Sequence, residues 1–455
     1  MQHRLRVLII VLLLFLTGCD IQKHPEDLMR APALTGEMNQ LHKAIMNYLP
    51  ADAQIYIPLN SENAVAIGEV DLNSDGIMEA YATYSLKVNN KTIHGVILLK
   101  QSSDSWTKLN QIEINSDELD FIRFADLAND GQLKIMIGSV ISTDENKILH
   151  IYGNDIQEFR KIAELPYAQM EVGNLNNDPV PEIIILNNNR FEMTADASVY
   201  QYDGRAMVLL DKLPLDGSIN GYSDVKFGKA SSSVNGVFIE AGVGAHSAYS
   251  ILLIMKDGKL QDVFGTAKPD GGWIPFIPRS TYPEDANHDG IIEIPLLEEL
   301  TPDASYAEMA FRTVWNKWDG QTGLIPAYYT YDDYGAGYSL TLPNSWKSNL
   351  QVSGEHDPFE ETTFFYVNER GRKIADLASI RYYDNVLNQE DIERKLQQSK
   401  LHYQILGMRY NRLFVGIIPD EASQAANLSP KELEKLKEMR IDLAYLLEHI
   451  ELTER

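Results

Sequence analysis

The sequence is poor in cysteine and in basic residues. Its 455 residues include a single cysteine, Cys19, so the chain cannot form an internal disulfide bond. The 40 lysines and arginines are outnumbered by 65 aspartates and glutamates, which gives a formal net charge of −25. A nucleic-acid partner is therefore not expected, because phosphate binding requires positive side chains. Phosphate-loop, zinc and dinucleotide-binding motifs are also missing, so the sequence indicates no nucleotide or zinc chemistry.

Long apolar runs are confined to the start of the chain. A short basic stretch precedes the apolar run 7–16, which is too short to span a membrane comfortably as a mature helix. The tetrapeptide that follows, Leu16-Thr17-Gly18-Cys19, resembles a bacterial lipobox. This resemblance implies that residues 1–18 are a lipoprotein signal peptide and that acyl chains on Cys19 anchor the protein to the extracytoplasmic face of the cell membrane. An ordinary signal peptide is the alternative, and the absence of disulfides favours a Gram-positive surface over a periplasm.

Residues 19–51 are expected to form a polar tether and then one amphipathic helix over 35–49. Apolar residues recur there at helical spacing, and a proline ends the helix. These apolar residues are Leu34, Met38, Leu41, Ile45 and Leu49. We expect their stripe to pack on the following domain, because the polar face lacks the lysines and arginines of a membrane-surface helix.

Residues 52–326 contain short β-rich runs separated by turns that return regularly. The two most complete turns are Asp71-Leu72-Asn73-Ser74-Asp75-Gly76-Ile77-Met78-Glu79 and Asp285-Ala286-Asn287-His288-Asp289-Gly290-Ile291-Ile292-Glu293. Related turns start at Asp126, Asn174 and Ser231, so the repeating unit is about fifty residues long. A unit with four short strands cannot bury both of its faces alone, and successive units must stack. We therefore predict a mainly β fold, a β-propeller of about five four-stranded blades over 52–326, followed by a smaller α+β domain over 327–455.

The two complete turns have the chemistry of a calcium site. Carboxylate or amide oxygens at every second position can surround one hard cation, and calcium accepts roughly 6–8 oxygens in loose geometry. The turns resemble FG-GAP or VCBS repeats, the calcium-loop blades of propellers such as the integrin α-subunit head. The resemblance implies calcium as cofactor and the following ligands: Asp71, Asn73, Asp75, the Ile77 carbonyl and Glu79, and Asp285, Asn287, Asp289, the Ile291 carbonyl and Glu293. The alternative is that these residues were selected for turn geometry alone.

The three other turns depart from this pattern. In the second turn, Ala128 removes a ligand and Lys134 replaces the acid at the ninth position, so we expect an ion pair in place of a metal. The fourth turn, aligned from Ser231 to Ile239, contains no acid. The third turn retains a weak metal site at best, formed by Asn176, Asp178 and Glu182.

Residues 327–455 combine strand-like runs with two helix signals. The segment 338–346, Tyr-Ser-Leu-Thr-Leu-Pro-Asn-Ser-Trp, is similar to the opening of small domains of the PsbP or Mog1 type, and no function is transferred from this similarity. Asn388 is expected to cap one helix. A second helix starts after Ser429, within a capping box, and its apolar stripe extends to Ile450. These signals predict helices that cover one face of a sheet.

No catalytic residue is assigned from the sequence. His246 and Ser247 are adjacent on a glycine-containing loop, but neighbours on a strand point apart and no third group completes a triad. Together with Trp273, which lies in an aromatic and turn-rich segment, they form a candidate ligand loop. We expect a cell-surface adhesion or binding protein whose propeller binds an extracellular protein or a cell-wall glycan. The alternatives are a secreted polysaccharide lyase or hydrolase and a structural subunit of an envelope complex.

Overall fold

The computed structural model describes most of the chain, and its contacts form two compact units. The first unit comprises Met1–Ile57, Asn63–Asp71 and Asp75–Asn115, and the second comprises Pro58–Glu62, Leu72–Ser74 and Ser116–Arg455. The described residues are 36–453 except for 61–64, 90, 103–104, 142–146, 154–158, 246, 266–275, 278–280, 302–303, 305–308, 322, 356–359, 385, 387–388, 421–423 and 425–427. The signal peptide, Cys19 and the tether up to residue 35 therefore lie outside the described residues, as does Asn388.

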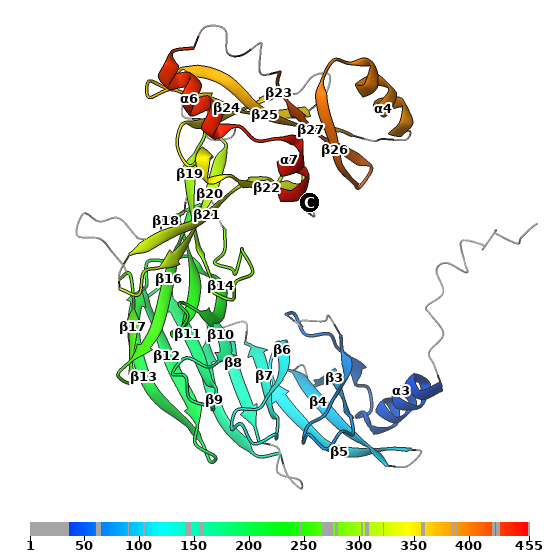
Figure 1. Ribbon diagram of the computed structural model, residues 1–455. Helices are drawn as coiled ribbons and strands as arrows, with labels where there is room; N and C mark the ends of the chain where they lie inside the picture. Colours follow the sequence, from blue (N-terminus) through cyan, green and yellow to red (C-terminus); the bar gives the residue numbers. More distant parts are fainter. Residues whose placement is uncertain are drawn as a thin grey trace, which may run out of the picture. The chain divides into compact units, whose positions relative to one another are not determined.

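Among the described residues, the first unit contains helix α3 (Gly36–Tyr48) and one antiparallel sheet (Figure 1). Leu41 and Ile45 of helix α3 pack in one apolar cluster with Ala80, Tyr84 and Ile97 of the sheet. Burying each of these two helix side chains contributes about 1.5–3 kcal/mol. The sheet consists of β1 (Gln54–Ile55), β2 (Ile67–Val70), β3 (Glu79–Val88), β4 (Lys91–Ser102) and β5 (Ser105–Asn115). The predicted amphipathic helix and its packing on the sheet that follows it are confirmed.

The second unit contains four antiparallel sheets in which each strand pairs with the next strand along the chain, except that β18 pairs with β16 and β28 (Ile450–Leu452) with β22 (Figure 1). The second sheet has β6 (Glu118–Ala125), β7 (Lys134–Val140), β8 (Lys147–Tyr152) and β9 (Lys161–Tyr167). The third has β10 (Gln169–Gly173), β11 (Glu182–Asn189), β12 (Thr194–Tyr202) and β13 (Met207–Asp216). The fourth has β14 (Gly221–Lys229), β15 (Asn235–Val243), β16 (Ser247–Lys256), β17 (Lys259–Asp262) and β18 (Phe276–Ile277), and the fifth has β19 (Ile294–Glu299), β20 (Phe311–Trp318), β21 (Leu324–Asp333) and β22 (Tyr338–Leu342). The mainly β fold with about five sheets of the propeller-blade type is thus confirmed.

The inner strands of these sheets are buried on both faces. Ile183 of β11 packs with Met136 of the second sheet, whereas its neighbour Ile184 packs with Val237 of the fourth sheet. Successive side chains of a strand point to opposite faces, so each residue reaches a different neighbouring sheet. A strand covered on both faces appears in the sequence as a continuous apolar run. Within the second unit, successive sheets therefore share their cores.

The predicted domain boundary at residue 326 falls inside β21, so the fifth sheet extends into the predicted α+β domain. β22 and β28 (Ile450–Leu452), the last strand of the chain, complete that sheet. A sixth sheet follows, with the order β23-β24-β25-β27-β26. Its strands are β23 (Leu350–Glu355), β24 (Glu360–Val367), β25 (Lys373–Tyr383), β26 (His402–Arg409) and β27 (Arg412–Ile418). The helices are η1 (Asn344–Trp346), α4 (Gln389–Gln398), α6 (Pro430–Met439) and α7 (Leu443–His449), which gives the predicted α+β organisation.

The helix predicted from Ser429 to Ile450 is divided into two. Ser429 forms the expected capping box at the start of α6, but Arg440 leaves the helical conformation with ψ 140°. Asp442 then caps α7 by accepting a hydrogen bond from the Tyr445 N–H at 2.8 Å. The prediction of one continuous helix is wrong because a strong N-cap residue interrupts the apolar stripe. None of the helices in the described ranges is long and apolar enough to cross a membrane.

Candidate functional site

Four of the five oxygen-rich turns occupy equivalent positions. Each turn connects two segments that pair with each other: β2 with β3, β6 with β7, β10 with β11, and the bridge residue Glu284 with Glu293, which precedes β19. The residue before the turn pairs with the ninth residue of the motif: Val70 with Glu79, Ala125 with Lys134, Gly173 with Glu182, and Glu284 with Glu293. The fourth residue of each turn is left-handed, with φ of 58° at Ser74, 53° at Asn129, 64° at Asn177 and 60° at His288. The predicted repeat is therefore confirmed at the level of individual turn residues.

The remaining turn, the fourth, is shorter than the others, and its predicted alignment is wrong. Lys229 pairs with Asn235, while Ile239 lies within β15 opposite Val225. Ala230 is buried at the start of this turn. The sequence alignment failed because the Asn-Gly pair that suggested a turn belongs to the following strand.

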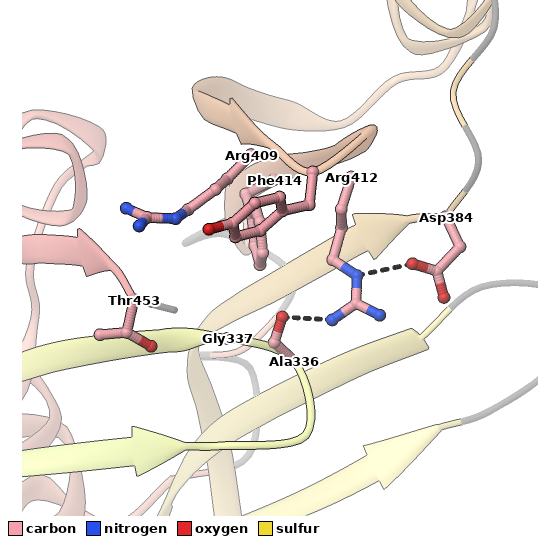
Figure 2. A pocket seen from close by; sticks show the side chains of 8 residues that line it. Ala336, Gly337, Asp384, Arg409, Arg412, Phe414 and Thr453 are labelled. Atoms are coloured by element: carbon pink, nitrogen blue, oxygen red, sulfur yellow. Dashed lines mark hydrogen bonds and ion pairs between the residues drawn. The ribbon is translucent and has the colours of Figure 1, made fainter. Parts of the chain in front are cut away.

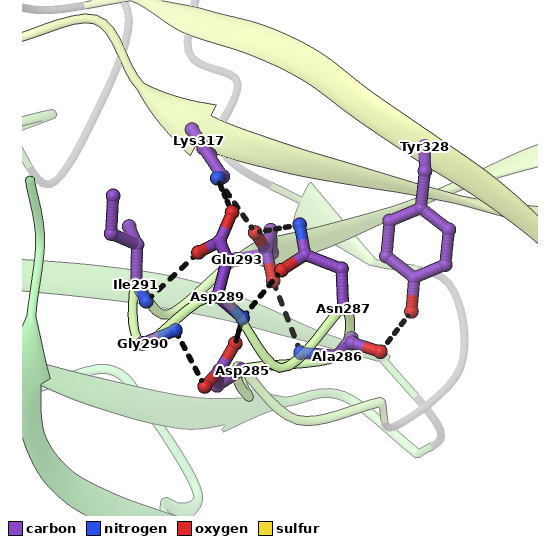
Figure 3. Close-up of polar contacts among 9 residues, drawn as sticks. All are labelled: Asp285, Ala286, Asn287, Asp289, Gly290, Ile291, Glu293, Lys317 and Tyr328. Atoms are coloured by element: carbon purple, nitrogen blue, oxygen red, sulfur yellow. Dashed lines mark hydrogen bonds and ion pairs between the residues drawn. The ribbon is translucent and has the colours of Figure 1, made fainter.

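The fifth turn folds around its own carboxylates (Figure 3). Asp285 accepts hydrogen bonds from the backbone N–H groups of Asp289 and Gly290, both at 2.9 Å. Asp289 in turn accepts one from the Ile291 N–H at 3.1 Å. Gly290 has a φ of 84°, which favours glycine because a side chain would be strained there. The glycine at the sixth position is therefore part of the geometry that brings the acids together.

Glu293 is fully buried next to this turn and receives several donors. Its carboxylate accepts hydrogen bonds from the Ala286 N–H at 3.0 Å and the Asn287 side-chain amide at 2.9 Å. Lys317 of β20 places its ammonium 3.5 Å from Glu293 Oε1 and in contact with Asp289 (Figure 3). Burial raises the pKa of Glu293, whereas the bond from Lys317 lowers the pKa of Asp289. An ammonium group therefore lies between two of the predicted calcium ligands.

In the first turn, Asp71 and Asp75 accept the same backbone hydrogen bonds as Asp285 and Asp289 do in the fifth. Asp71 accepts hydrogen bonds from the N–H groups of Asp75 at 3.2 Å and Gly76 at 2.9 Å, and Asp75 accepts one from Ile77 at 2.8 Å. These residues belong to the first unit, whereas Asn73, another predicted ligand, belongs to the second.

The donors of the first and fifth turns fit calcium in their chemistry. Each turn supplies carboxylate, amide and carbonyl oxygens, which are the ligands that this cation prefers. Their side chains are not gathered into a ready-made site, because no group of three or more His, Cys, Asp or Glu in the described part of the chain is placed to hold a metal ion. In the fifth turn, Lys317 contacts two of the carboxylates that calcium would need.

Side-chain nitrogens also occupy the second and third turns. Lys134 lies 3.5 Å from Asp130, which confirms the predicted ion pair. In the third turn, the Gln201 amide donates to both oxygens of Asp178, at 3.0 and 3.2 Å, and to Glu182 at 3.0 Å. The Asn176 amide donates to Asp178 at 2.8 Å. The three predicted weak ligands are therefore close together, but they are bound to a neutral amide.

Most of the predicted ligand loop, His246 and Trp273, lies outside the described residues. Ser247 begins β16 and pairs with Val243 across the sheet. The ligand loop therefore stays a prediction.

Sequence reasoning missed a serine, a histidine and a glutamate on three adjacent strands of the second sheet. Ser139 Oγ lies 2.9 Å from His150 Nε2, and His150 Nδ1 lies 3.4 Å from Glu164. These spacings resemble a hydrolase triad. The exposed fraction is 1% for Ser139 and 6% for His150, so a substrate carbonyl has no access to the hydroxyl. Only the strand register reveals this group, because its members are distant in sequence.

A cavity of about 220 Å³ lies beside the turn between β26 and β27 in the second unit (Figure 2). Arg412 is buried in its wall, where Asp384 at 2.6 Å and the carbonyl groups of the β21–β22 turn hold it. Arg409 donates to the Leu452 carbonyl at 2.5 Å. Between the two arginines, Tyr410 is 71% exposed and has a φ of 47°. The cavity therefore combines two anchored guanidinium groups with an exposed aromatic ring.

Comparison with known proteins gives similar folds at low identity. No family model matches the chain, and no curated protein matches it. The β-propeller domain of the Trilobed protease from Pyrococcus furiosus is 10% identical, with 70% of this chain and 95% of that chain covered and a TM-score of 0.29. The exotype rhamnogalacturonan lyase YesX is 9% identical (72% and 84% covered, TM-score 0.30), and the rhamnogalacturonan lyase PL11 of Bacillus licheniformis is 10% identical (71% and 76%, TM-score 0.30). At these TM-scores the likenesses carry no argument about function.

Proposed function

We propose that the protein is a lipid-anchored binding protein of the cell surface that holds an extracellular protein or a cell-wall glycan. The observation that carries this proposal is the cavity next to Tyr410. Tyrosine and arginine are the residue types that most often dominate binding energy at interfaces. The sheets supply a rigid frame, and the lipobox-like segment supplies the membrane anchor.

The two-residue turn between β26 and β27 displays the Tyr410 ring in the solvent. Arg409 pairs with Arg412 across the hairpin, and Tyr410 and Asn411 between them are both left-handed, with φ 47° and 60°, as a type I′ turn requires. The ring is 71% exposed, and the Arg409 guanidinium lies 5.3 Å from its centre. The flanking arginines suit a ligand with carboxylate or phosphate groups.

Calcium enters this proposal as a structural cation of the first turn. The resemblance to FG-GAP repeats and the oxygen donors at Asp71, Asp75 and Glu79 support it. Extracellular calcium modules commonly bind in the range of roughly 10⁻⁴–10⁻³ M, which suits a structural role. Bound calcium would stabilise the folded protein by RT ln(1 + c/Kd), where c is the calcium concentration, so the effect grows with the logarithm of that concentration.

Replacing Tyr410 tests the proposed binding site. We expect Tyr410→Ala to weaken binding of the full-length protein to its ligand at least about tenfold, a typical loss for an aromatic hot spot. The measurement is a pull-down with purified peptidoglycan, anionic wall polymers and envelope proteins, tested separately, followed by titration of the component that binds.

A matched control removes another exposed ring. Phe191 lies in the turn between β11 and β12 and is 90% exposed. Phe191→Ala should leave binding unchanged. Equal binding by Tyr410→Ala and the wild-type protein, or no binding to any of the three classes, would contradict the proposed function.

A further inference from the structure

The acidic turns share a feature on the strand beside them. In the third turn, the ninth residue Glu182 pairs across the sheet with Gln201 of β12. In the fifth sheet, Ile294 pairs with Asn316, so Lys317 stands across from the ninth residue Glu293. A nitrogen-bearing side chain thus reaches the turn from the same register position in both repeats.

The contacts of Lys317 show that its ammonium belongs to the turn. It bonds to Asp289 and lies 3.5 Å from Glu293, whose side chain is 0% exposed. The Lys317 side chain itself is 27% exposed, so most of its surface is covered. The Lys317 ammonium is therefore bound to two acids of the turn.

The charge of the fifth turn explains why a cation is needed there. The fifth turn carries three carboxyl groups, on Asp285, Asp289 and Glu293, and the last is removed from water. A buried carboxylate is costly unless a positive partner or hydrogen-bond donors compensate for it. Lys317 supplies such a charge without a metal ion.

We propose that Lys317 is a built-in cation that takes the place of calcium in the fifth turn. The turn is then held in its folded conformation without metal, and calcium must displace the ammonium to bind. Removing Lys317 converts the turn into a calcium site with Asp285, Asn287, Asp289, the Ile291 carbonyl and Glu293 as ligands. This inference rests on the proposal that turns of this type bind calcium.

The first turn provides the contrast within the same protein. Ala80 pairs with Leu99, so Lys100 stands across from Glu79 as Lys317 stands across from Glu293. Lys100, however, is exposed, whereas Lys317 is largely covered. The two complete turns therefore differ in the exposure of the lysine at this register position.

The experiment compares calcium binding in full-length variants. Asp71→Asn removes a ligand of the first turn, and Lys317→Met is then added in the same chain. Calcium stoichiometry by equilibrium dialysis and melting temperature in chelator and in millimolar calcium are measured for each protein. We expect no calcium response with Asp71→Asn alone. The double variant should melt several degrees lower in chelator, recover in calcium, and bind one calcium ion per chain.

Two further variants exclude trivial explanations. Lys259→Met removes the same charge from an ion pair with Asp211, 3.1 Å away and outside any turn, and should create no calcium response. Lys317→Gln copies the amide of the third turn and should fold without gaining calcium affinity. If Lys317→Met does not fold in chelator, Lys317→Ala in the Asp71→Asn background is the test variant.

The outcomes separate this inference from the proposed function. If Asp71→Asn abolishes the calcium response of the wild-type protein, the first turn binds calcium; this result does not depend on Lys317. Two results would overturn the role of Lys317. In the first, the Asp71→Asn protein still binds calcium, and adding Asp289→Asn to it abolishes that binding. In the second, the double variant Asp71→Asn, Lys317→Met binds no calcium.

Discussion

The fifth turn and the middle of the fourth sheet each bury a glutamate completely, but they surround it differently. Glu293 has the ammonium of Lys317 and two N–H donors around it. Glu240 has the Ser250 hydroxyl at 3.0 Å on one oxygen, and its other oxygen has no hydrogen-bond partner in the described structure. Burial raises the pKa of both, and that of Glu240 to about 8. The comparison teaches that the partners of a buried carboxyl group, and not burial alone, determine its charge at neutral pH.

The third turn is intermediate between these two cases. Glu182 is fully buried and accepts hydrogen bonds from the Leu175 N–H at 2.7 Å and from the Gln201 amide at 3.0 Å. Burial raises the pKa of Glu182, and no ammonium is among these donors. The three glutamates thus form a natural series: ammonium, amide and hydroxyl partners.

The largest effect is expected at Glu240, the member with the weakest partner. The pKa of Glu240 is about 8 in the folded protein, whereas the unfolded chain releases this proton near the ordinary pKa of 4.5. Between these values the folded state binds more protons, so stability falls as pH rises, by about 4–5 kcal/mol in total. Glu240→Gln cannot ionise and should be free of this loss. Urea unfolding at about pH 5, 7 and 9 measures the difference.

The control for Glu240 is an exposed glutamate. Glu192 lies in the turn between β11 and β12, and Glu192→Gln should keep the wild-type pH dependence. If Glu240→Gln and the wild-type protein lose stability in parallel between pH 5 and 9, Glu240 is already ionised at neutral pH. The contrast with Glu293 would then disappear.

The second largest effect is expected at Gln201. Gln201→Leu leaves the buried Glu182 and the neighbouring Asp178 without their shared amide donor, which should cost about 2–3 kcal/mol. Gln201→Lys copies the fifth turn and should lose much less stability. Its stability relative to the wild-type protein should rise at high pH, where Glu182 is charged. Urea unfolding of both variants at neutral pH provides the measurement.

The control is Gln261, an exposed glutamine on β17 of the fourth sheet. Gln261→Leu should change stability by no more than about 0.5 kcal/mol. A similarly small change for Gln201→Leu would mean that the amide does not stabilise the third turn. The series of three partners would then lose its middle member.

The sequence predicts the local parts of these sites well. The α3 helix, the capping box at Ser429 and the positions of four oxygen-rich turns follow from spacing and turn chemistry, which act over a few residues. The ion pair at Lys134 also follows, because both partners lie in one turn. Local patterns therefore identified where the acids of each turn lie.

The partners of those acids could not be predicted in the same way. Lys317 and Gln201 lie on the next strand, and their positions depend on the register set by a hairpin between the strands. The same applies to Ser139 and His150, which meet only because β7 and β8 pair. The alignment of the fourth turn failed for a related reason, since Asn235 extends the strand after a shortened turn. A full calcium motif in sequence therefore does not reveal whether a lysine from the next strand reaches it.

The smallest effect is expected at a buried base, His150, where the slope of stability against pH has the opposite sign to that of Glu240. Burial lowers the pKa of His150 below its ordinary value of 6.5, so the folded state resists protonation more than the unfolded chain does. Stability should therefore be lost as pH falls below about 6.5, and His150→Gln should flatten this loss. The exposed His402 of β26 provides a control, because His402→Gln leaves the buried ring in place. Measuring both variants in the Glu240→Gln background removes the opposing slope of that glutamate. If His150→Gln still loses the same stability as pH falls, that loss comes from carboxylates. The histidine then has no place in the comparison.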